Sequence, residues 1–182
     1  TGRSIDIRSS AITLQVAADD RASTYRRPRF GPVAATRHCV LQATASKFGL
    51  FATASRMVSF VDPPADFAEE FATAARLSAL WLALARAGDH PGGLTDAQRR
   101  LLKEGPYEHE WRLAPPGWWT GQSACEEVFN RNGSERFAAG HAVVFRAQIG
   151  RCVVADTFVL RGDRWTPNTA AEEWPLLRYV VQ

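Results

Sequence analysis

The sequence is poor in lysine and cysteine, and each shortage narrows the kind of protein it can be. Only Lys47 and Lys103 are lysines among its 22 basic residues, so arginine carries nearly all the positive charge. The three cysteines, Cys39, Cys125 and Cys152, lie far apart and form no C-x-x-C pair. An odd, dispersed set argues against a disulfide framework and suits a reducing compartment. We therefore expect a cytoplasmic protein.

Long apolar runs are also missing. No run approaches the roughly 20 residues needed to span a bilayer, and the first residues carry no apolar signal core. Hydrophobic residues make up 46% of the 182 residues, which suits a soluble, folded chain, and we expect one domain over residues 1–182. The chain begins at Thr1 without an initiator methionine, which we interpret as processing or trimming.

The charge pattern gives little support to a membrane or nucleic-acid partner. The net charge is only +3, and no basic stripe carries the interleaved aromatic residues of a nucleic-acid binder. The one dense basic cluster, residues 26–29, is interpreted as a solvated loop.

Spacings typical of metal or nucleophile sites are absent as well. The four histidines show neither H-E-x-x-H nor a pair at helical offset, and there is no phosphate-binding glycine loop or G-x-S-x-G. Segment 108–110 (Glu-His-Glu) fits a polar surface turn or a weak metal site, and we favour the turn. His38 and Cys39 are adjacent, so their side chains diverge on a strand and make a poor catalytic pair. No catalytic residue is assigned, and no metal or cofactor is expected.

Hydrophobic periodicity predicts a mixture of strands and helices. Strands are expected at residues 12–16, in a hairpin or meander over 38–61 with extended segments at 48–51 and 57–61, at 142–149 and 152–160, and at 176–181. Gly150 and Arg151 are a good tight-turn signal between the runs at 142–149 and 152–160.

Two helices are expected after the meander. Asp62 and the prolines that follow predict a helix start, and apolar residues at helical spacing continue it to residue 87, before Gly88. Thr95 to Gln98 forms a capping box that predicts a second, short helix through Lys103. Residues 106–122 are interpreted as irregular and 125–129 as a helical turn.

Two consecutive tryptophans, Trp118 and Trp119, lie among prolines and glycines. Two neighbouring indole rings do not easily bury in one core, which suggests that one of them lines a pocket or an interface. The alternative is that both rings take part in ordinary packing. The sequence leaves these alternatives open.

Five segments in order resemble the methionine-aminopeptidase/creatinase superfamily, the "pita-bread" metallopeptidases. They are 47–58 (KFGLFATASRMV), the long helix, 110–121 (EWRLAPPGWWTG), 137–145 (FAAGHAVVF) and 154–160 (VADTFVL). The resemblance covers about residues 12–165. It implies an α+β fold with a curved antiparallel sheet backed by helices, and it leaves open whether the first strands of that fold are missing before Thr1.

The same resemblance implies a dinuclear metal site built from two Asp, one His and two Glu. Carried over one by one, these ligands fall near Gln42, at Thr53, near Pro115, and at Arg146 and Ala155. None of the five is a carboxylate or an imidazole, and a guanidinium is a permanent cation that repels a metal ion. Asp156, next to the last position, should point to the opposite face of its strand.

The resemblance therefore implies the fold without the hydrolase. The main hypothesis is a non-catalytic metallopeptidase-like domain that binds a peptide, a small acid or a protein. Arg146 would hold a carboxylate or phosphate. The other candidate binding residues are Trp118, Trp119, Arg56, Gln42 and Thr53.

Two alternatives remain. One is an active hydrolase, either a metallopeptidase or aminopeptidase with relocated ligands or an enzyme that uses Cys39, His141 or Glu126. The other is a structural oligomerisation subunit, such as a homodimer, whose interface includes the tryptophan pair and the alanine-rich helix.

Overall fold

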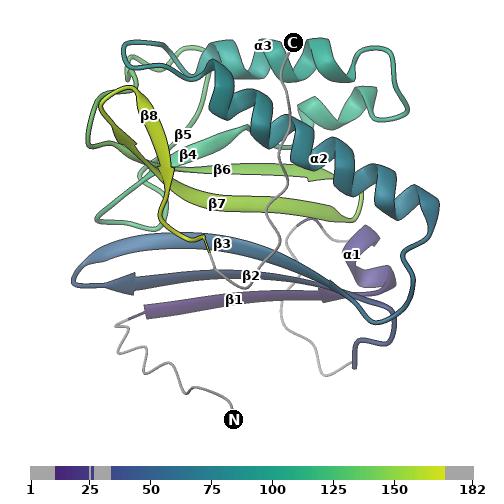
Figure 1. The fold of residues 1–182 in the computed structure, drawn as a ribbon. Coiled ribbons are helices and arrows are strands. Elements are labelled where there is room, and N and C mark those ends of the chain that lie inside the picture. The colour runs from purple at the N-terminus through teal and green to yellow at the C-terminus, as the bar shows by residue number, and fades with distance from the viewer. Residues whose placement is uncertain (1–10, 25, 27–33, 171–182) are drawn as a thin grey trace.

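The fold combines two antiparallel sheets with the two longer helices on one side, as Figure 1 shows. The structure is a computed structural model and describes residues 11–24, 26 and 34–170. The small sheet has the order β1-β2-β3, and the large sheet has the order β5-β4-β6-β7-β8. The prediction of an α+β fold with antiparallel strands backed by helices is confirmed. The predicted strand at 176–181 lies outside the described residues.

The small sheet is formed by β1 (Ala11–Ala18), β2 (His38–Lys47) and β3 (Leu50–Ser59). Strands β2 and β3 make a hairpin whose turn places Phe48 and Gly49 at positive φ. The two extended segments expected at 48–51 and 57–61 belong largely to one strand, β3. The ladder with β2 continues unbroken through the residues between them.

The large sheet follows the helices in sequence. Its strands are β4 (Gly117–Thr120), β5 (Glu127–Val128), β6 (Ala142–Ile149), β7 (Cys152–Arg161) and β8 (Arg164–Pro167). The predicted β6–β7 hairpin is confirmed, with Gly150 in its turn at φ 50°. The prediction of an irregular stretch at 106–122 is wrong for β4, and the predicted helical turn at 125–129 is the short strand β5. Strand β4 forms because it pairs with β6, and β5 forms because it pairs with β4; this pairing satisfies their backbone groups and outweighs the local turn signals.

Helix α2 (Ala65–Leu84) covers the face of the large sheet that lies away from the small sheet, as Figure 1 shows. Helix α3 (Gly92–Leu102) packs beside it, and a 3-10 helix, η1 (Glu108–Arg112), leads toward β4. Between α2 and the large sheet lies the main core, where Leu77, Trp81 and Phe145 are almost fully buried.

The predicted helix starts are displaced in the structure. Helix α2 begins after Pro64 and has no side-chain cap, so Asp62 does not cap it. Helix α3 begins at Gly92, before the predicted cap at Thr95. It starts early because His90 accepts a hydrogen bond from the Gly92 amide through Nδ1 (3.0 Å), which supplies the missing backbone partner.

A short helix, α1 (Asp20–Thr24), follows β1, and Asp19 holds the connection to β2 in place. The Asp19 carboxylate accepts hydrogen bonds from the backbone amides of Thr36 (3.0 Å), Arg37 (2.9 Å) and His38 (2.9 Å). Asp19 also has a φ of 48°, which aspartate tolerates better than most residues.

We expect the stabilisation by Asp19 to depend on pH. The His38 amide, followed by the Thr36 hydroxyl, holds the Asp19 pKa well below its ordinary value of 3.8. Because the folded-state pKa is lowered, the stabilisation is complete above about pH 4 and is lost as the pH falls further. Asp19→Asn should therefore be less stable than wild type in urea unfolding at neutral pH, and the difference should shrink in acid. Asp163→Asn controls for charge change alone. A difference that does not change with pH would contradict this assignment.

Within the described part of the chain, none of the helices combines the length and apolar character needed to cross a membrane.

Candidate functional site

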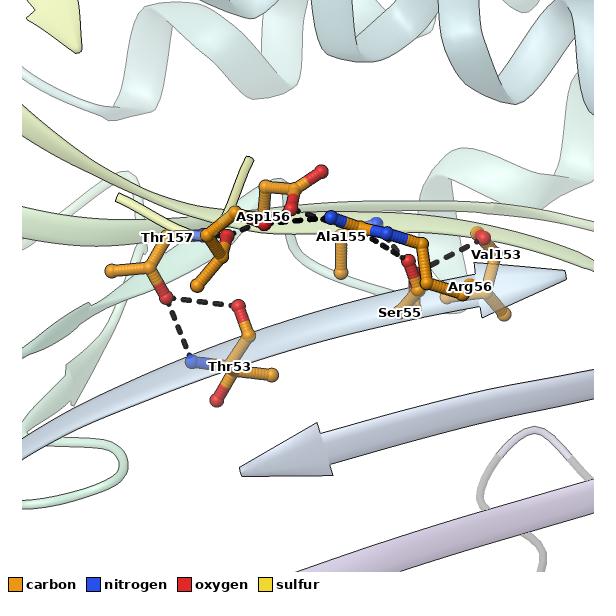
Figure 2. Close-up of polar contacts among 8 residues, drawn as sticks. Thr53, Ser55, Arg56, Val153, Ala155, Asp156 and Thr157 are labelled. Carbon is orange, nitrogen blue, oxygen red and sulfur yellow. Dashed lines mark hydrogen bonds and ion pairs between the residues drawn. The ribbon is translucent and has the colours of Figure 1, made fainter. Parts of the chain in front are cut away.

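The two sheets meet along β3 and β7, and two hydroxyl side chains join these strands. Thr157 Oγ1 accepts a hydrogen bond from the Thr53 amide (2.7 Å) and donates one to the Thr53 carbonyl (2.9 Å). Ser55 Oγ accepts from the Ala155 amide (2.7 Å) and donates to the Val153 carbonyl (3.2 Å). Figure 2 shows this set of contacts, which we call the hydroxyl seam. The seam fixes how the small sheet faces the large one.

Beside the seam, Arg146 projects from β6 into the space between the sheets. It pairs across the ladder with Ala155, and paired residues share one face of a sheet. The Arg146 side chain is nearly inaccessible, with the residue only 6% exposed. Its Nε donates to Oε1 of Gln42 on β2 (2.8 Å), and its Nη2 donates to the Arg26 carbonyl (3.2 Å). The structure thus brings Gln42 and Arg146, 104 residues apart in the chain, into direct contact.

Arg26 and Glu110 close the same region, and sequence reasoning missed both. The Arg26 guanidinium forms an ion pair with Oε2 of Glu110. Glu110 is only 5% exposed, and its Oε1 accepts from the Gly150 amide (3.2 Å). The prediction of a surface turn at 108–110 is therefore wrong for Glu110. The prediction of a solvated loop is wrong for Arg26, because burial of a carboxylate requires a cationic partner.

A small cavity lies between the sheets next to these side chains. Its volume is about 20 Å³, and its lining includes Arg26, Gln42, Arg146 and Gln148. A space of this size holds about one water molecule. Two buried polar atoms, Nη1 of Arg26 and Oε1 of Gln148, have no hydrogen-bond partner among the described residues. A single water or a small anion fits this place, and a peptide does not.

The residues here do not fit the two metal ions that the family resemblance implies. Gln42 and Thr53 use their polar groups in hydrogen bonds with the protein, and Ala155 has no donor atom. Arg146 brings a fixed positive charge into the space where the metals would be held. Pro115 offers no side-chain ligand. The next residue, Pro116, accepts a hydrogen bond from the Arg146 amide through its carbonyl (2.9 Å). Among the described residues, no group of three or more His, Cys, Asp or Glu could hold a metal ion.

The two tryptophans point to opposite faces of β4. Trp118 packs on the side of the small sheet, in a cluster with Val144 and Ala155, and its Nε1 donates to the Ala124 carbonyl (2.8 Å). Trp119 is buried in the main core, with its ring 5.2 Å from that of Phe129. The structure therefore brings Trp118 to the inner face with Arg146 and does not bring Trp119 there.

Arg56 belongs to a different group of contacts. Its Nη1 donates to the Asp156 carboxylate (3.0 Å), and its Nη2 donates to the Thr169 carbonyl (2.7 Å). Asp156 thus turns away from Arg146, as predicted from the alternation along β7. Burial raises the Asp156 pKa, although hydrogen bonds from Thr169 and Arg56 act in the other direction.

The residues considered for other hydrolytic chemistry are not assembled into one centre. Glu126 and His141 line an open cleft of about 600 Å³ at the end of β4 and β6. Cys39 is buried at the start of β2 and does not line that cleft. Burial raises the Cys39 pKa, and the negative charge of Asp19 raises it further by a smaller amount. Both effects disfavour the nucleophilic thiolate.

Comparisons with known proteins identify the fold. No protein-family profile and no curated protein sequence matches the chain. Among solved structures, the prolidase from Pyrococcus furiosus superposes with a TM-score of 0.76 at 14% identity, covering 88% of this chain and 49% of that one. The X-Pro aminopeptidase from Thermotoga maritima MSB8 gives 0.78 at 14% identity, covering 91% and 49%.

A third similar structure is the N-terminal domain of the FACT complex subunit SPT16 from Eremothecium gossypii. Its TM-score is 0.64 at 14% identity, covering 76% of this chain and 35% of that one. The chain thus has the pita-bread fold, as the resemblance implied. It spans about half the length of the prolidase and aminopeptidase chains.

Proposed function

We propose that this chain is a non-catalytic pita-bread domain that binds a protein partner through its outer surface. The observation that carries the proposal is the contact between Arg146 and Gln42 in the space between the sheets. The resemblance assigns a metal ligand to each of these two positions. Here a guanidinium and an amide satisfy each other, and the remaining positions supply a threonine, an alanine and a proline.

The small volume of the cavity between the sheets excludes some of the ligands considered for a binding module. The cavity beside Arg146 holds about one water, so a peptide or an organic acid does not fit beside the guanidinium. At most a single small anion would occupy it. Binding of a larger partner therefore falls to the outer surface. The similar SPT16 domain belongs to a subunit of the FACT complex, which is compatible with such a role.

Two experiments test whether the domain lacks the peptidase chemistry. The purified protein is dialysed with Mn²⁺, Co²⁺ or Zn²⁺ and analysed for bound metal, and it is assayed on Xaa-Pro dipeptides beside an active prolidase. We expect less than one ion per chain and no hydrolysis above the blank. These results follow because neither Arg146 nor Gln42 offers an anionic ligand.

The opposite outcome is equally clear. One or more bound ions per chain, together with hydrolysis that a chelator removes, would replace this proposal with the relocated-ligand peptidase. Hydrolysis that resists the chelator but is lost on Glu126→Gln or His141→Asn would instead place an enzyme site in the 600 Å³ cleft.

The tryptophan pair gives little support to the alternative of a structural oligomerisation subunit. Trp119 is 6% exposed and Trp118 donates to its own chain, so Trp119 offers little surface to a second copy. Measurement of the mass in solution decides whether another face forms a homodimer.

A further inference from the structure

The outer surface carries a cleft of about 340 Å³ between α3 and η1 whose lining is strongly basic. Arg99, Arg100 and Lys103 approach it from the end of α3, and Arg112 approaches it from η1, with Trp111 among them. We call these five residues the basic cleft. Its volume lies in the range of pockets that bind ligands or a few side chains of a partner.

Trp111 organises two of the guanidinium groups. The guanidinium carbons of Arg99 and Arg112 each lie 5.2 Å from the centre of a Trp111 ring. A guanidinium stacked on an aromatic ring is held in a defined plane, and its N–H groups point outward within that plane. Such a group can bind a carboxylate through two parallel hydrogen bonds without first losing much side-chain freedom.

The cleft has more positive than negative charge available for a partner. None of its four cations forms an ion pair with another described residue, whereas two acids, Asp96 and Glu108, share the lining. The Asp96 carboxylate is already bound by Arg131, with Nη2 2.6 Å from Oδ1. Glu108 is then the only lining acid without such a partner in the described chain.

A structural reason explains part of this arrangement but not all of it. Cations in the last turn of a helix interact favourably with its dipole, which accounts for Arg99 and Arg100 in α3. The dipole of α3 does not account for Arg112 and Trp111, which belong to a separate element. The convergence of both elements on one cleft points to a ligand.

We propose that the basic cleft docks an acidic segment of a partner protein, with carboxylates held by Arg99 and Arg112. This inference rests on the proposed function and names the chemistry of the partner. A protein segment fits better than a nucleic acid, because the cations gather at one cleft and not along a stripe. The one aromatic ring of the cleft already has two guanidinium groups against it, so it gives a base no free platform.

Fluorescence anisotropy with a labelled hexapeptide of glutamate tests the proposal. We expect saturable binding that weakens with added salt, and no binding of the matched glutamine hexapeptide. Arg99→Gln/Arg112→Gln should raise the Kd about tenfold or more, since charge-assisted hydrogen bonds are lost. Arg161→Gln/Arg164→Gln, which removes the same charge from the exposed β7–β8 turn, should change the Kd less than about twofold.

A second variant separates stacking from charge. Trp111→Leu keeps all four cations but removes the ring, so it should weaken binding several-fold while the salt dependence persists. Urea unfolding confirms that each variant is folded. The inference is overturned if the glutamate peptide does not bind, if both double variants weaken it equally, or if a duplex oligonucleotide binds this cleft more tightly. None of these results bears on metal-dependent hydrolysis. The non-catalytic assignment is tested separately, by the metal-binding and dipeptide assays.

Discussion

Thr157→Val is expected to lower the free energy of unfolding by about 3 kcal/mol, because two buried backbone groups lose their partner. The Thr157 hydroxyl serves both the amide and the carbonyl of Thr53, and both threonines are about 1% exposed. Valine has nearly the same shape but no hydroxyl, so the loss comes from hydrogen bonding and not from a cavity. Urea unfolding of wild type and variant measures the difference.

Thr157→Ser is the matched control for the hydroxyl seam. It keeps the hydroxyl and removes one methyl group, so it should cost only about 1 kcal/mol. Thr44→Val removes a hydroxyl whose one hydrogen bond to the described residues is with the Thr53 side chain (2.8 Å), and it should also cost less than Thr157→Val. If Thr157→Val and Thr157→Ser were equally stable, the hydroxyl would not join the two sheets as described.

Arg146→Ala is the second change with a large expected effect, a loss of about 3 kcal/mol. It leaves Oε1 of Gln42 and the Arg26 carbonyl without their donor, and it opens a void in a closed interior. Burying a guanidinium costs free energy, so its removal recovers part of the lost stability. The net effect is still destabilising, because the buried groups that bonded Arg146 are left without a hydrogen-bond donor. Chemical denaturation at constant salt gives the value.

A double-mutant cycle with Gln42→Ala isolates the Arg146–Gln42 contact. We expect a coupling of about 1 to 2 kcal/mol, typical of a hydrogen bond with one charged partner. A variant that keeps wild-type stability but loses affinity for a small anion would show that Arg146 is a ligand residue and not a structural one. Binding of the glutamate peptide to the basic cleft should be unaffected in either case.

The strands that were predicted well are those whose pattern is local. Segments β6 and β7 are β-rich runs separated by Gly150, and they fold as that pattern indicates. Strand β4 was hidden because prolines and glycines surround it. Once β4 is recognised, the period of two along a strand explains why Trp118 and Trp119 point to opposite faces.

The interior site could be predicted only through the family resemblance. That resemblance related Gln42 and Arg146, and the structure places them in contact. The partners Arg26 and Glu110 carry no local signal, because their burial is set by segments 84 residues apart that meet only after folding. Thr157 was visible in the sequence, but nothing in its neighbourhood reveals that its hydroxyl serves another strand.

The guanidinium between the sheets also limits how this interior can change over evolutionary time. A single step such as Arg146→Glu would bury an anion beside a neutral amide, and the nearby guanidinium of Arg26 is already paired with Glu110. Several further replacements, at 42, 53, 115 and 155, would have to accompany it before a divalent ion could compensate. A metal-binding interior is therefore separated from this one by several coordinated replacements and not by a single substitution.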